Sequence, residues 1–251
     1  METYLYDALY RHEKSYWWSV SRRDMVIDMW KSVQHREAEN VSILDVGCGT
    51  GAMLDILSEF GKAYGADNSE VAVRYCRNRM IGKTVVADMT SLPFGDGEFD
   101  LVTALDVVEH VDDDVTALGE LHRVCSHDGL LLLTVPAFNF LWSSRDRRLG
   151  HKRRYDVAEI VRKMETAGFR INKVSYTNLS YFLPLYLVVR LKSALRMDVK
   201  TDIAEVPSVL NRLLTGILAL ETILLRKMDF PFGISIVCMA RKSPNVSLDN
   251  G

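Results

Sequence analysis

The feature that most constrains this chain is the run VSILDVGCGTG at residues 41–51. Its first part is a short apolar segment of the kind that forms a buried parallel strand. Gly47, Gly49 and Gly51 follow, and glycine lets a backbone turn sharply and approach a ligand closely. A helix is then expected to open at Thr50–Ala52. A strand, a glycine turn and a helix in this order predict a nucleotide site at the edge of an α/β sheet.

The glycines alone leave two kinds of nucleotide open, because Gly47-x-Gly49-x-x-Ala52 also satisfies the loose fingerprint of dinucleotide sites. Asp45, just before the turn, favours one of them. A dinucleotide places a pyrophosphate at the turn, where the helix N-terminus attracts anions and a fixed carboxylate would repel them. S-adenosylmethionine (SAM) has no phosphate and carries two cationic groups, an ammonium and a sulfonium. An acidic strand end therefore suits SAM.

Asp45, Gly47, Gly49 and Gly51 match D/E-x-G-x-G-x-G, the first motif of the class I SAM-dependent methyltransferases. The chain resembles the small-molecule branch of this family, which includes the type 11 and ubiquinone-biosynthesis enzymes, over residues 41 to about 177 and in its final strand. The resemblance implies a Rossmann-like, seven-stranded, mostly parallel sheet with helices on both faces and an antiparallel last strand. It also implies SAM as the cofactor, S-adenosylhomocysteine as the product, and a cofactor contact for Cys48 in the turn.

Two more acidic strand ends follow at the family's spacing. Asp67 closes the segment KAYGAD, and a carboxylate there can accept hydrogen bonds from both ribose hydroxyls. The resemblance implies that Asp67 binds the SAM ribose, and that Asn68, Asp88 and the backbone amide of Met89 contact the adenine. The alternative for Asp67 is a helix N-cap, although the two residues after it fill that place better.

The fourth strand and the N-terminal segment complete the predicted cofactor site. The resemblance implies that the backbone around Leu105 and Asp106 faces the methionine ammonium of SAM. Trp18 and Arg22 belong to a segment that recurs in a subgroup of uncharacterised bacterial methyltransferases. We expect a helical lid there, with Arg22 reaching the SAM carboxylate. The alternative is that these aromatic residues simply pack a helix onto the sheet.

Methyl transfer needs in-line alignment of donor and acceptor, and it needs a base only if the nucleophile carries a proton. His110 lies just past the fourth strand and is the first candidate, because imidazole titrates near neutral pH. Its alternative role is a helix-start residue that packs or bonds to the backbone. His151 and Tyr155, in an H-x-R-R-Y stretch shared with the same subgroup, are alternative acid–base residues.

Asp106, Glu109 and His110 also raise the question of a metal. They are similar to an acidic-x-x-Glu-His motif of ubiquinone-type O-methyltransferases, some of which use a divalent ion. That motif usually opens with Glu, and Glu-His after this strand is widespread in methyltransferases without metal. We therefore expect no metal.

A loop rich in basic and aromatic residues follows the fifth strand. It should lie over the acceptor pocket, where Arg153 and Arg154 would bind a carboxylate or phosphate and Phe138 and Trp142 would line the wall. This predicts a small acceptor that is acidic, phosphorylated or linked to an anionic carrier. In the alternative, the loop is solvated and its arginines pair with nearby carboxylates, those of Asp146, Asp156 and Glu159.

Apolar runs alternate with helical patterns after residue 41, which predicts a parallel sheet covered by helices. The expected strands lie near 42–47, 62–67, 84–88, 99–105, 129–135, 170–177 and 234–241. The expected helices lie near 51–60, 69–80, 113–125 and 156–167. We divide the chain into an N-terminal helical lid (1–40), a SAM-binding core (41–178 and 229–243) and a helical insertion that roofs the acceptor pocket (179–228).

Composition excludes several other classes. The formal net charge of −2 gives no basic field for nucleic acid, and the four cysteines have no metal or disulfide spacing. No secretory signal is recognised, so we expect a cytoplasmic protein. Charges interrupt both apolar stretches of 179–228, so we expect no transmembrane span, with a peripheral membrane contact or a dimer face as other uses of that segment. We expect a monomer or homodimer.

Two rival functions stay open at this point. One is an NAD-linked oxidoreductase, which Asp45 disfavours. The other is a SAM-binding partner subunit that performs no chemistry.

Overall fold

The fold is seen in a computed structural model that describes residues 3–33, 41–80, 82–194 and 206–243. The remaining positions of the predicted lid and insertion, 1–2, 34–40 and 195–205, lie outside the described residues. One sheet of seven strands runs in the order β3-β2-β1-β4-β5-β7-β6. The strands are β1 Ser42–Val46, β2 Lys62–Asp67, β3 Lys83–Val86, β4 Phe99–Leu105, β5 Cys125–Pro136, β6 Phe169–Thr177 and β7 Ser235–Lys242.

The strand directions confirm the predicted fold class. β1 pairs in parallel with β2 and β4, and β3 and β5 continue that direction outward. β7 lies between β5 and β6 and is antiparallel to both. The strands start and end within a few residues of the predicted bounds. The main differences are that β3 ends at Val86, two residues before Asp88, and that β5 begins earlier, at Cys125.

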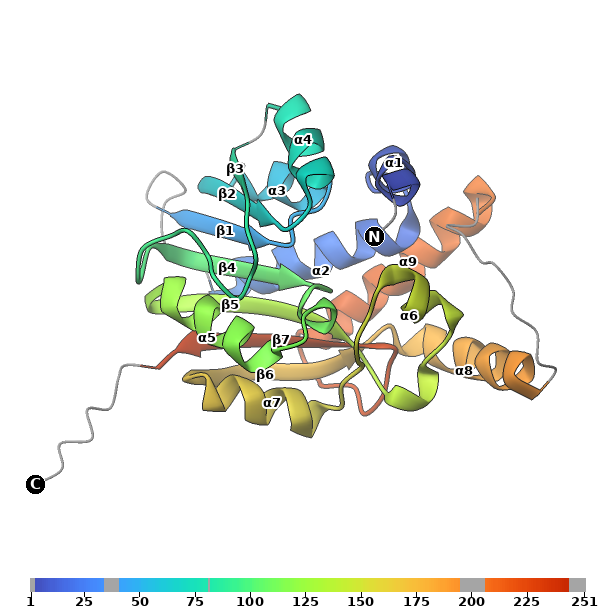
Figure 1. Cartoon of the computed structure of the whole chain (residues 1–251). Helices are drawn as coiled ribbons and strands as arrows, with labels where there is room; N and C mark the ends of the chain where they lie inside the picture. The colour runs from blue at the N-terminus through green and yellow to red at the C-terminus, as the bar shows by residue number, and fades with distance from the viewer. Residues whose placement is uncertain (1–2, 34–40, 81, 195–205, 244–251) are drawn as a thin grey trace, which may run out of the picture.

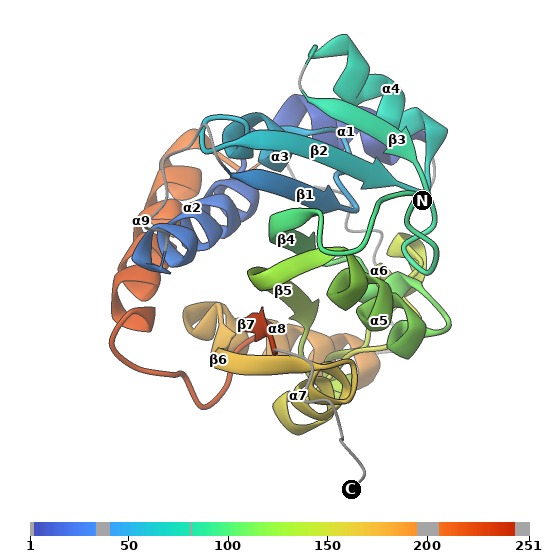
Figure 2. The ribbon, with the colours of Figure 1, turned by 90° about the vertical axis from the view of Figure 1, so that its left-hand side faces the viewer.

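Helices cover both faces of the sheet (Figures 1 and 2). They are α1 Thr3–His12, α2 Trp17–Val33, α3 Ala52–Leu57, α4 Glu70–Asn78, α5 Asp114–Val124, α6 Ser144–Leu149, α7 Val157–Thr166, α8 Leu179–Ala194 and α9 Ser208–Leu225. Side chains of α5 and α7 pack into one buried cluster, and those of α2, α3 and the end of α9 into the other. Apolar residues of β1, β4 and β5 alternate between the two clusters, which explains their unbroken apolar sequences.

The two N-terminal helices differ in their roles. Met25, Val26, Met29 and Trp30 of α2 are buried in the second cluster, so α2 is a core helix of the sheet rather than a cover. α1 lies against α4, where the rings of Tyr10 and Tyr75 are 4.8 Å apart. α1 enters neither core cluster, and the division of the first 40 residues into a lid stays a prediction.

The two helices of the insertion are joined by a buried carboxylate. Glu221 of α9 is 8% exposed and accepts hydrogen bonds from the N–H groups of Leu179 and Ser180, at 3.0 and 2.7 Å. These are the first residues of α8, whose N–H groups have no partner within their own helix. Glu221 thus acts as an N-cap supplied by another helix, while α9 itself packs along α2 (Figure 2).

By length and composition alone, α9 could cross a membrane. Its 18 residues have a mean hydropathy of 1.5, and 17% of them are buried. Among the described residues this is weak support for a span, since the apolar core helix of a soluble protein can have the same length and composition. The absence of a transmembrane span stays a prediction.

Candidate functional site

The glycine turn after β1 is fixed by close contacts. Gly47 has a φ of +73°, and a Cβ there would lie 2.5 Å from the side chain of Val107. Its N–H donates to the Ala66 carbonyl at 2.7 Å, which ties the turn to β2. Gly51 precedes α3 with a φ of +91°, and a Cβ on it would lie 3.0 Å from the sulfur of Cys76. Both positions therefore require glycine.

Asp45 is a buried carboxylate at the end of β1. It is 2% exposed and accepts a 2.6 Å hydrogen bond from the hydroxyl of Thr103. Burial raises its pKa to about 7, against the smaller opposing effects of that hydrogen bond and of the nearby Arg22. A cation placed beside Asp45 would stabilise its ionised form, so the residue is poised to interact with a cationic ligand.

The other two strand-end carboxylates are held by backbone N–H groups. Asp67 accepts from Gly49 and Ser69, each at 2.9 Å, and burial raises its pKa. Asp88 accepts from the N–H and hydroxyl of Thr90 at 2.8 and 2.7 Å, and these bonds lower its pKa. Each oxygen of Asp67 keeps a second lone pair for a ligand hydroxyl, and in Asp88 both bonds end on one oxygen, which leaves the other for a ligand amino group.

These groups line one cleft of about 570 Å³, a size typical of small-molecule sites. Of the predicted cofactor residues, those that line it are Trp18, Arg22, Asp45, Gly47, Cys48, Gly49, Asp67, Asn68, Asp88, Met89, Leu105 and Asp106. Gly51 is not among the lining residues. Gly51 packs against Cys76, and its cofactor contact stays a prediction.

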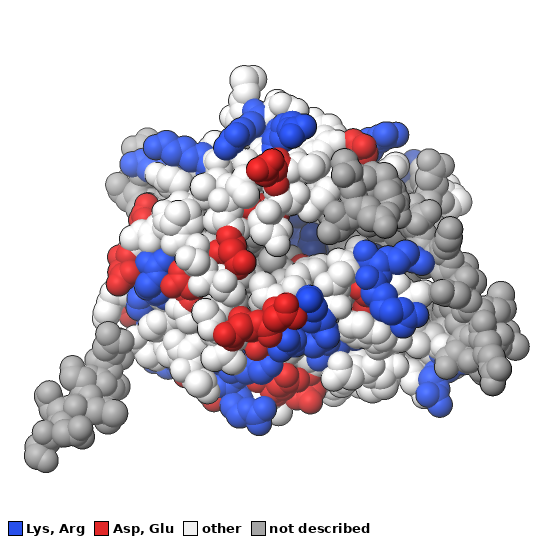
Figure 3. Space-filling view, in the orientation of Figure 1, with Lys and Arg blue, Asp and Glu red and all other residues white. Residues whose placement is uncertain are grey.

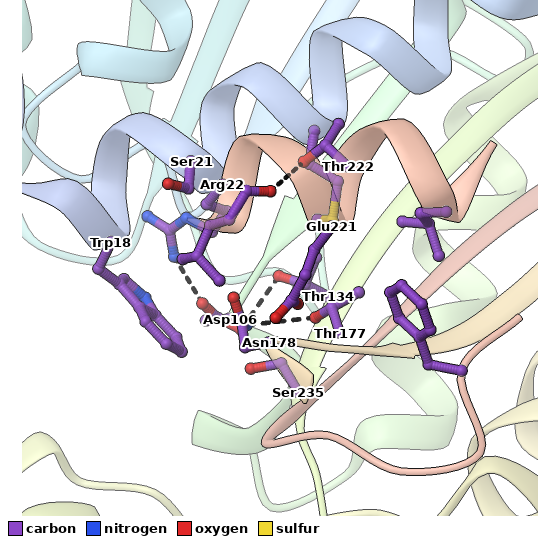
Figure 4. Close-up of a pocket in the computed structure, with 14 residues that line it drawn as sticks. Trp18, Ser21, Arg22, Asp106, Thr134, Thr177, Asn178, Glu221, Thr222 and Ser235 are labelled. Atoms are coloured by element: carbon purple, nitrogen blue, oxygen red, sulfur yellow. Dashed lines mark hydrogen bonds and ion pairs between the residues drawn. The ribbon is translucent and has the colours of Figure 1, made fainter. Parts of the chain in front are cut away.

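Arg22 and Asp106 meet each other across the cleft wall (Figure 4). A guanidinium nitrogen of Arg22 is 2.5 Å from a carboxylate oxygen of Asp106, whose other oxygen accepts from Thr134 at 3.0 Å. Asp106 has a φ of +55°, in the left-handed region. The guanidinium of Arg22 is thus paired with Asp106, and a contact between Arg22 and the SAM carboxylate stays a prediction.

The residues present fit SAM. Its ribose needs a hydrogen-bond acceptor, its adenine amino group needs another, and its two cationic groups need negative charge nearby. Asp67, Asp88 and Asp45 supply oxygen acceptors for these needs on one cleft wall, beside a turn that a ligand can approach closely. Any of the three would be a poor neighbour for a pyrophosphate.

The predicted acid–base residues divide into two groups. His110 and His151 line the cleft, and their rings are 4.8 Å apart. Tyr155 is fully buried, is not among the lining residues, and donates its hydroxyl to Asp114 at 2.8 Å. Burial and this carboxylate raise the pKa of Tyr155. Tyr155 thus has a buried, structural place in the described chain, and its acid–base role stays a prediction that this position does not favour.

The predicted acceptor-binding residues are mostly engaged elsewhere. Arg153 bonds to Asp114 at 3.1 Å and to a backbone carbonyl, and it does not line the cleft. Arg154 lines the cleft, but it forms two hydrogen bonds to Asp146, at 2.8 and 3.1 Å.

The two predicted aromatic wall residues are also displaced from the cleft. Neither Phe138 nor Trp142 is among its lining residues. Phe138 instead stacks on Tyr176, with ring centroids 4.7 Å apart. The alternative of a loop held by ion pairs describes this segment better than acceptor binding does.

Sequence reasoning missed the contact between Glu13, just after α1, and the glycine turn. Glu13 is 7% exposed, accepts a 2.5 Å hydrogen bond from the hydroxyl of Thr50, and pairs with Arg79. Burial raises its pKa, against the opposing effects of those two partners. Thr50 inside the turn was a visible signal, but nothing in the sequence indicated which N-terminal acid its hydroxyl would contact.

Comparison with known proteins agrees with this site. A family model described as a methyltransferase domain matches residues 44–133. A protein of Mycolicibacterium smegmatis, named as a probable SAM-dependent methyltransferase, is 29% identical over 163 residues, which are 63% of this chain and 61% of that protein. The malonyl-[acyl-carrier protein] O-methyltransferase of Pseudescherichia vulneris is 30% identical over 139 residues, which are 52% and 55% of the two chains. The chain thus spans less than two thirds of these relatives.

The fold is shared with solved structures at low sequence identity. The structure of a Haloferax volcanii protein in complex with the Trm112 methyltransferase activator superposes with a TM-score of 0.61 and 18% identity, over 95% of this chain and 96% of that one. At this identity the likeness concerns the fold alone. The matching domain over residues 44–133, the relatives and the strand-end carboxylates together make the chain similar to the class I SAM-dependent methyltransferases, a family whose cofactor is SAM.

Proposed function

We propose that the chain transfers a methyl group from SAM to a small-molecule acceptor. The observation that carries this proposal is the meeting of Asp45, Asp67 and Asp88 with the glycine turn on one wall of a single cleft. The cleft extends beyond the predicted cofactor residues to α8 and the segment after β5, and this second part is the proposed place of the acceptor. Lining residues there include Leu149, Tyr181 and Leu185.

SAM supplies a methyl group already activated by its sulfonium. As the acceptor forms its bond to the methyl carbon, the bond from that carbon to sulfur breaks and S-adenosylhomocysteine remains. The residues of the chain hold donor and acceptor in line and limit access of water, which supplies a large part of the acceleration. If the nucleophile carries a proton, the imidazoles of His110 and His151 lie on the cleft wall to receive it or to bind the acceptor.

The acceptor part of the cleft supports an anionic substrate through a residue that the sequence reasoning did not select. Arg145 of α6 lines the cleft, and no hydrogen bond or ion pair links it to another described residue. Basic side chains gather over α6 beside a recess on this face (Figure 3). The acceptor named for one relative, malonyl on a carrier protein, is itself acidic and carrier-linked.

Replacing Arg145 with Ala is expected to raise the KM for an anionic acceptor about tenfold, because a charge-assisted hydrogen bond is lost at a partly solvated site. The measurement uses radiolabelled SAM and the best acceptor from a panel of small carboxylates and phosphate esters. The effect should shrink at high salt. Arg147→Ala is the matched control, since Arg147 lies on the same helix and does not line the cleft. Equal KM values for the Arg145→Ala variant and the wild type would remove Arg145 from the acceptor site.

The test of the cofactor is a calorimetric titration of the full chain with SAM and with S-adenosylhomocysteine. One molecule of either is expected to bind per chain, with NAD giving no heat. A folded chain that shows no heat with SAM at high protein concentration would contradict the proposal. Binding of SAM without methylation of any acceptor would favour the rival of a partner subunit that performs no chemistry.

The insertion supports one further part of the proposal, a peripheral contact with a membrane surface. Large apolar side chains of α8 and α9 are more than half exposed, and these are Leu183, Leu187, Leu191, Val209, Leu213, Leu220 and Ile223. Clustered exposed apolar side chains commonly mark interaction surfaces. A cytoplasmic location and a monomeric or homodimeric state complete the proposal.

A further inference from the structure

Three potential metal ligands meet at the acceptor end of the cleft. Glu109 and His110 come from the 3₁₀ turn Val108–His110, and His151 comes from the loop after α6. One ligand atom from each lies within 4.8 Å of the others. The two segments are tied together, because the N–H of Lys152 donates to the Glu109 carbonyl at 2.7 Å.

Glu109 is the unusual member of this cluster. It is 0% exposed, and neither of its carboxylate oxygens has a hydrogen-bond partner among the described residues. The nearest cationic candidate is the Nε2 of His151, 3.9 Å from one oxygen, which is too far for a hydrogen bond. Buried carboxylates normally have partners, so an unpaired one that lines a cleft points to a missing ligand.

The two imidazoles are oriented as metal ligands usually are. The Nδ1 of His151 is 3.0 Å from a carboxylate oxygen of Asp146, which leaves Nε2 directed toward Glu109. Asp146 is itself fixed by Arg154. The His110 ring is hydrogen-bonded to the backbone of Gly150. A carboxylate or a carbonyl behind a histidine is the common outer shell of a metal site, because it sets the tautomer and the ring orientation.

We propose that Glu109, His110 and His151 bind a divalent transition-metal ion at the acceptor end of the cleft. Two imidazoles and one carboxylate form a ligand set that suits Zn²⁺ and related ions, with further positions left open toward the cleft. In a tetrahedral site the ligand atoms lie roughly 3.4 Å apart, so the three side chains need to close by about 1 Å. Their charge sum fits a cation, since the carboxylate provides the negative charge.

This ligand set differs from the one considered in the sequence. There the third ligand was Asp106, and no metal was expected. The structure places Asp106 in contact with Arg22 and Thr134, which occupy its oxygens. His151 takes the third position instead, 41 residues beyond His110 in the chain, so neighbouring sequence positions could not reveal it.

The consequence for chemistry rests on the proposed function. A metal ion here would coordinate an oxygen of the acceptor and lower the pKa of a bound hydroxyl, which then needs a weaker base. Coordination would replace the base role predicted for His110. The open positions face the same cleft as the SAM-binding carboxylates, so the metal would select acceptors with an oxygen nucleophile.

The test uses the full chain after dialysis against a chelator, titrated with Co²⁺ and Zn²⁺ by calorimetry and by the visible absorption of Co²⁺. One ion per chain is expected. Glu109→Gln and His151→Gln should each weaken binding at least 100-fold, and Asp146→Asn should weaken it 10- to 100-fold through the orientation of His151. Zn²⁺ should raise the melting temperature of the wild type and leave that of Glu109→Gln unchanged.

His127→Gln is the control, since His127 is exposed and does not line the cleft, and it should bind the ion as the wild type does. A folded wild-type chain that takes up less than a tenth of an equivalent overturns the proposal, as does an unchanged affinity in both Glu109→Gln and His151→Gln. A parallel SAM titration separates the two proposals. Metal binding without SAM binding would contradict only the methyltransferase function, and SAM binding by a chain that binds no ion would contradict only the metal site.

Discussion

Replacing Asp45 with Asn should weaken SAM binding by roughly 10- to 100-fold, the range expected for the loss of a hydrogen bond or contact with a charged group. The substitution keeps an oxygen that can accept from Thr103, so the turn is expected to stay in place. The wild-type affinity should also rise with pH through about 7, because the cationic ligand interacts with ionised Asp45, whose pKa is raised to about 7 by burial. The affinity of the variant should lack this pH dependence.

The same substitution is expected to stabilise the ligand-free chain. Asp45 has a pKa of about 7 when folded and about 3.8 when unfolded, so the unfolded chain releases this proton first as pH rises. The contribution of Asp45 to stability therefore falls between about pH 4 and pH 7. Asn does not titrate, so the variant should exceed the wild type by up to about 4 kcal/mol in free energy of unfolding at pH 8, with the difference vanishing near pH 4.

Urea unfolding at pH 5 and pH 8 and calorimetry with SAM at pH 6, 7 and 8 measure both effects. Asp96→Asn is the control, because its side chain is 80% exposed and lies outside the cleft lining. It should change neither the SAM affinity nor its pH dependence. If the SAM affinities of the wild type and Asp45→Asn change with pH in parallel, the ionisation of Asp45 does not control SAM binding.

Replacing Asp114 with Ala should lower the free energy of unfolding by about 3 kcal/mol at pH 7. One oxygen of this buried carboxylate accepts from Tyr155 at 2.8 Å, Lys163 at 2.6 Å and Arg153 at 3.1 Å. Removing it leaves the fully buried hydroxyl of Tyr155 unpaired, which costs about 1–3 kcal/mol, and takes one of their partners from Lys163 and Arg153. Chemical denaturation measures the loss. SAM affinity should change little, because Asp114 does not line the cleft.

The contribution of Asp114 to the free energy of unfolding depends on pH with the opposite sign to that of Asp45. Burial opposes the charge of Asp114, but hydrogen bonds from Lys163 and Tyr155 outweigh it, and its pKa is lowered below 3.8. Its stabilising contribution is therefore present above about pH 4 and is lost as pH falls through the folded pKa. Asp112→Ala is the control, since Asp112 is 85% exposed and pairs with the exposed Lys152. A loss of under 1 kcal/mol is expected there, and an equal loss in both variants would contradict the argument.

The cofactor end of the cleft was predictable because its signals are local. Asp45 and Asp67 each end an apolar strand, and Asp88 comes two residues after one. The carboxyl ends of parallel strands meet at one edge of a sheet, so chain order alone places these side chains on a common wall. The seven strands and the antiparallel last strand followed from the same alternation and from the family resemblance, whereas the order of the strands in the sheet comes from the structure. For these three carboxylates, the spacing in the sequence is therefore enough to predict that they lie close together.

The acceptor end was less predictable because its contacts join distant segments. Arg153 and Arg154 had the right chemistry for an anion, but each had several acids within reach, and only folding selects Asp114 and Asp146 as their partners. The contact of Glu13 with Thr50 joins two distant segments, and no hydrophobic periodicity in the sequence indicates that they pack together. Arg145 was one arginine among many until α6 placed it at the cleft.

The cap that Glu221 places on α8 has a consequence for exchanging this segment between enzymes. Tyr181 and Leu185, which line the acceptor part of the cleft, stand on a helix whose start is held from α9. A graft of α8 alone would separate the helix from its cap and shift both side chains. Acceptor preference should therefore be transferable between homologues only when residues 179–221 move as one piece, while the cofactor wall is left as it is.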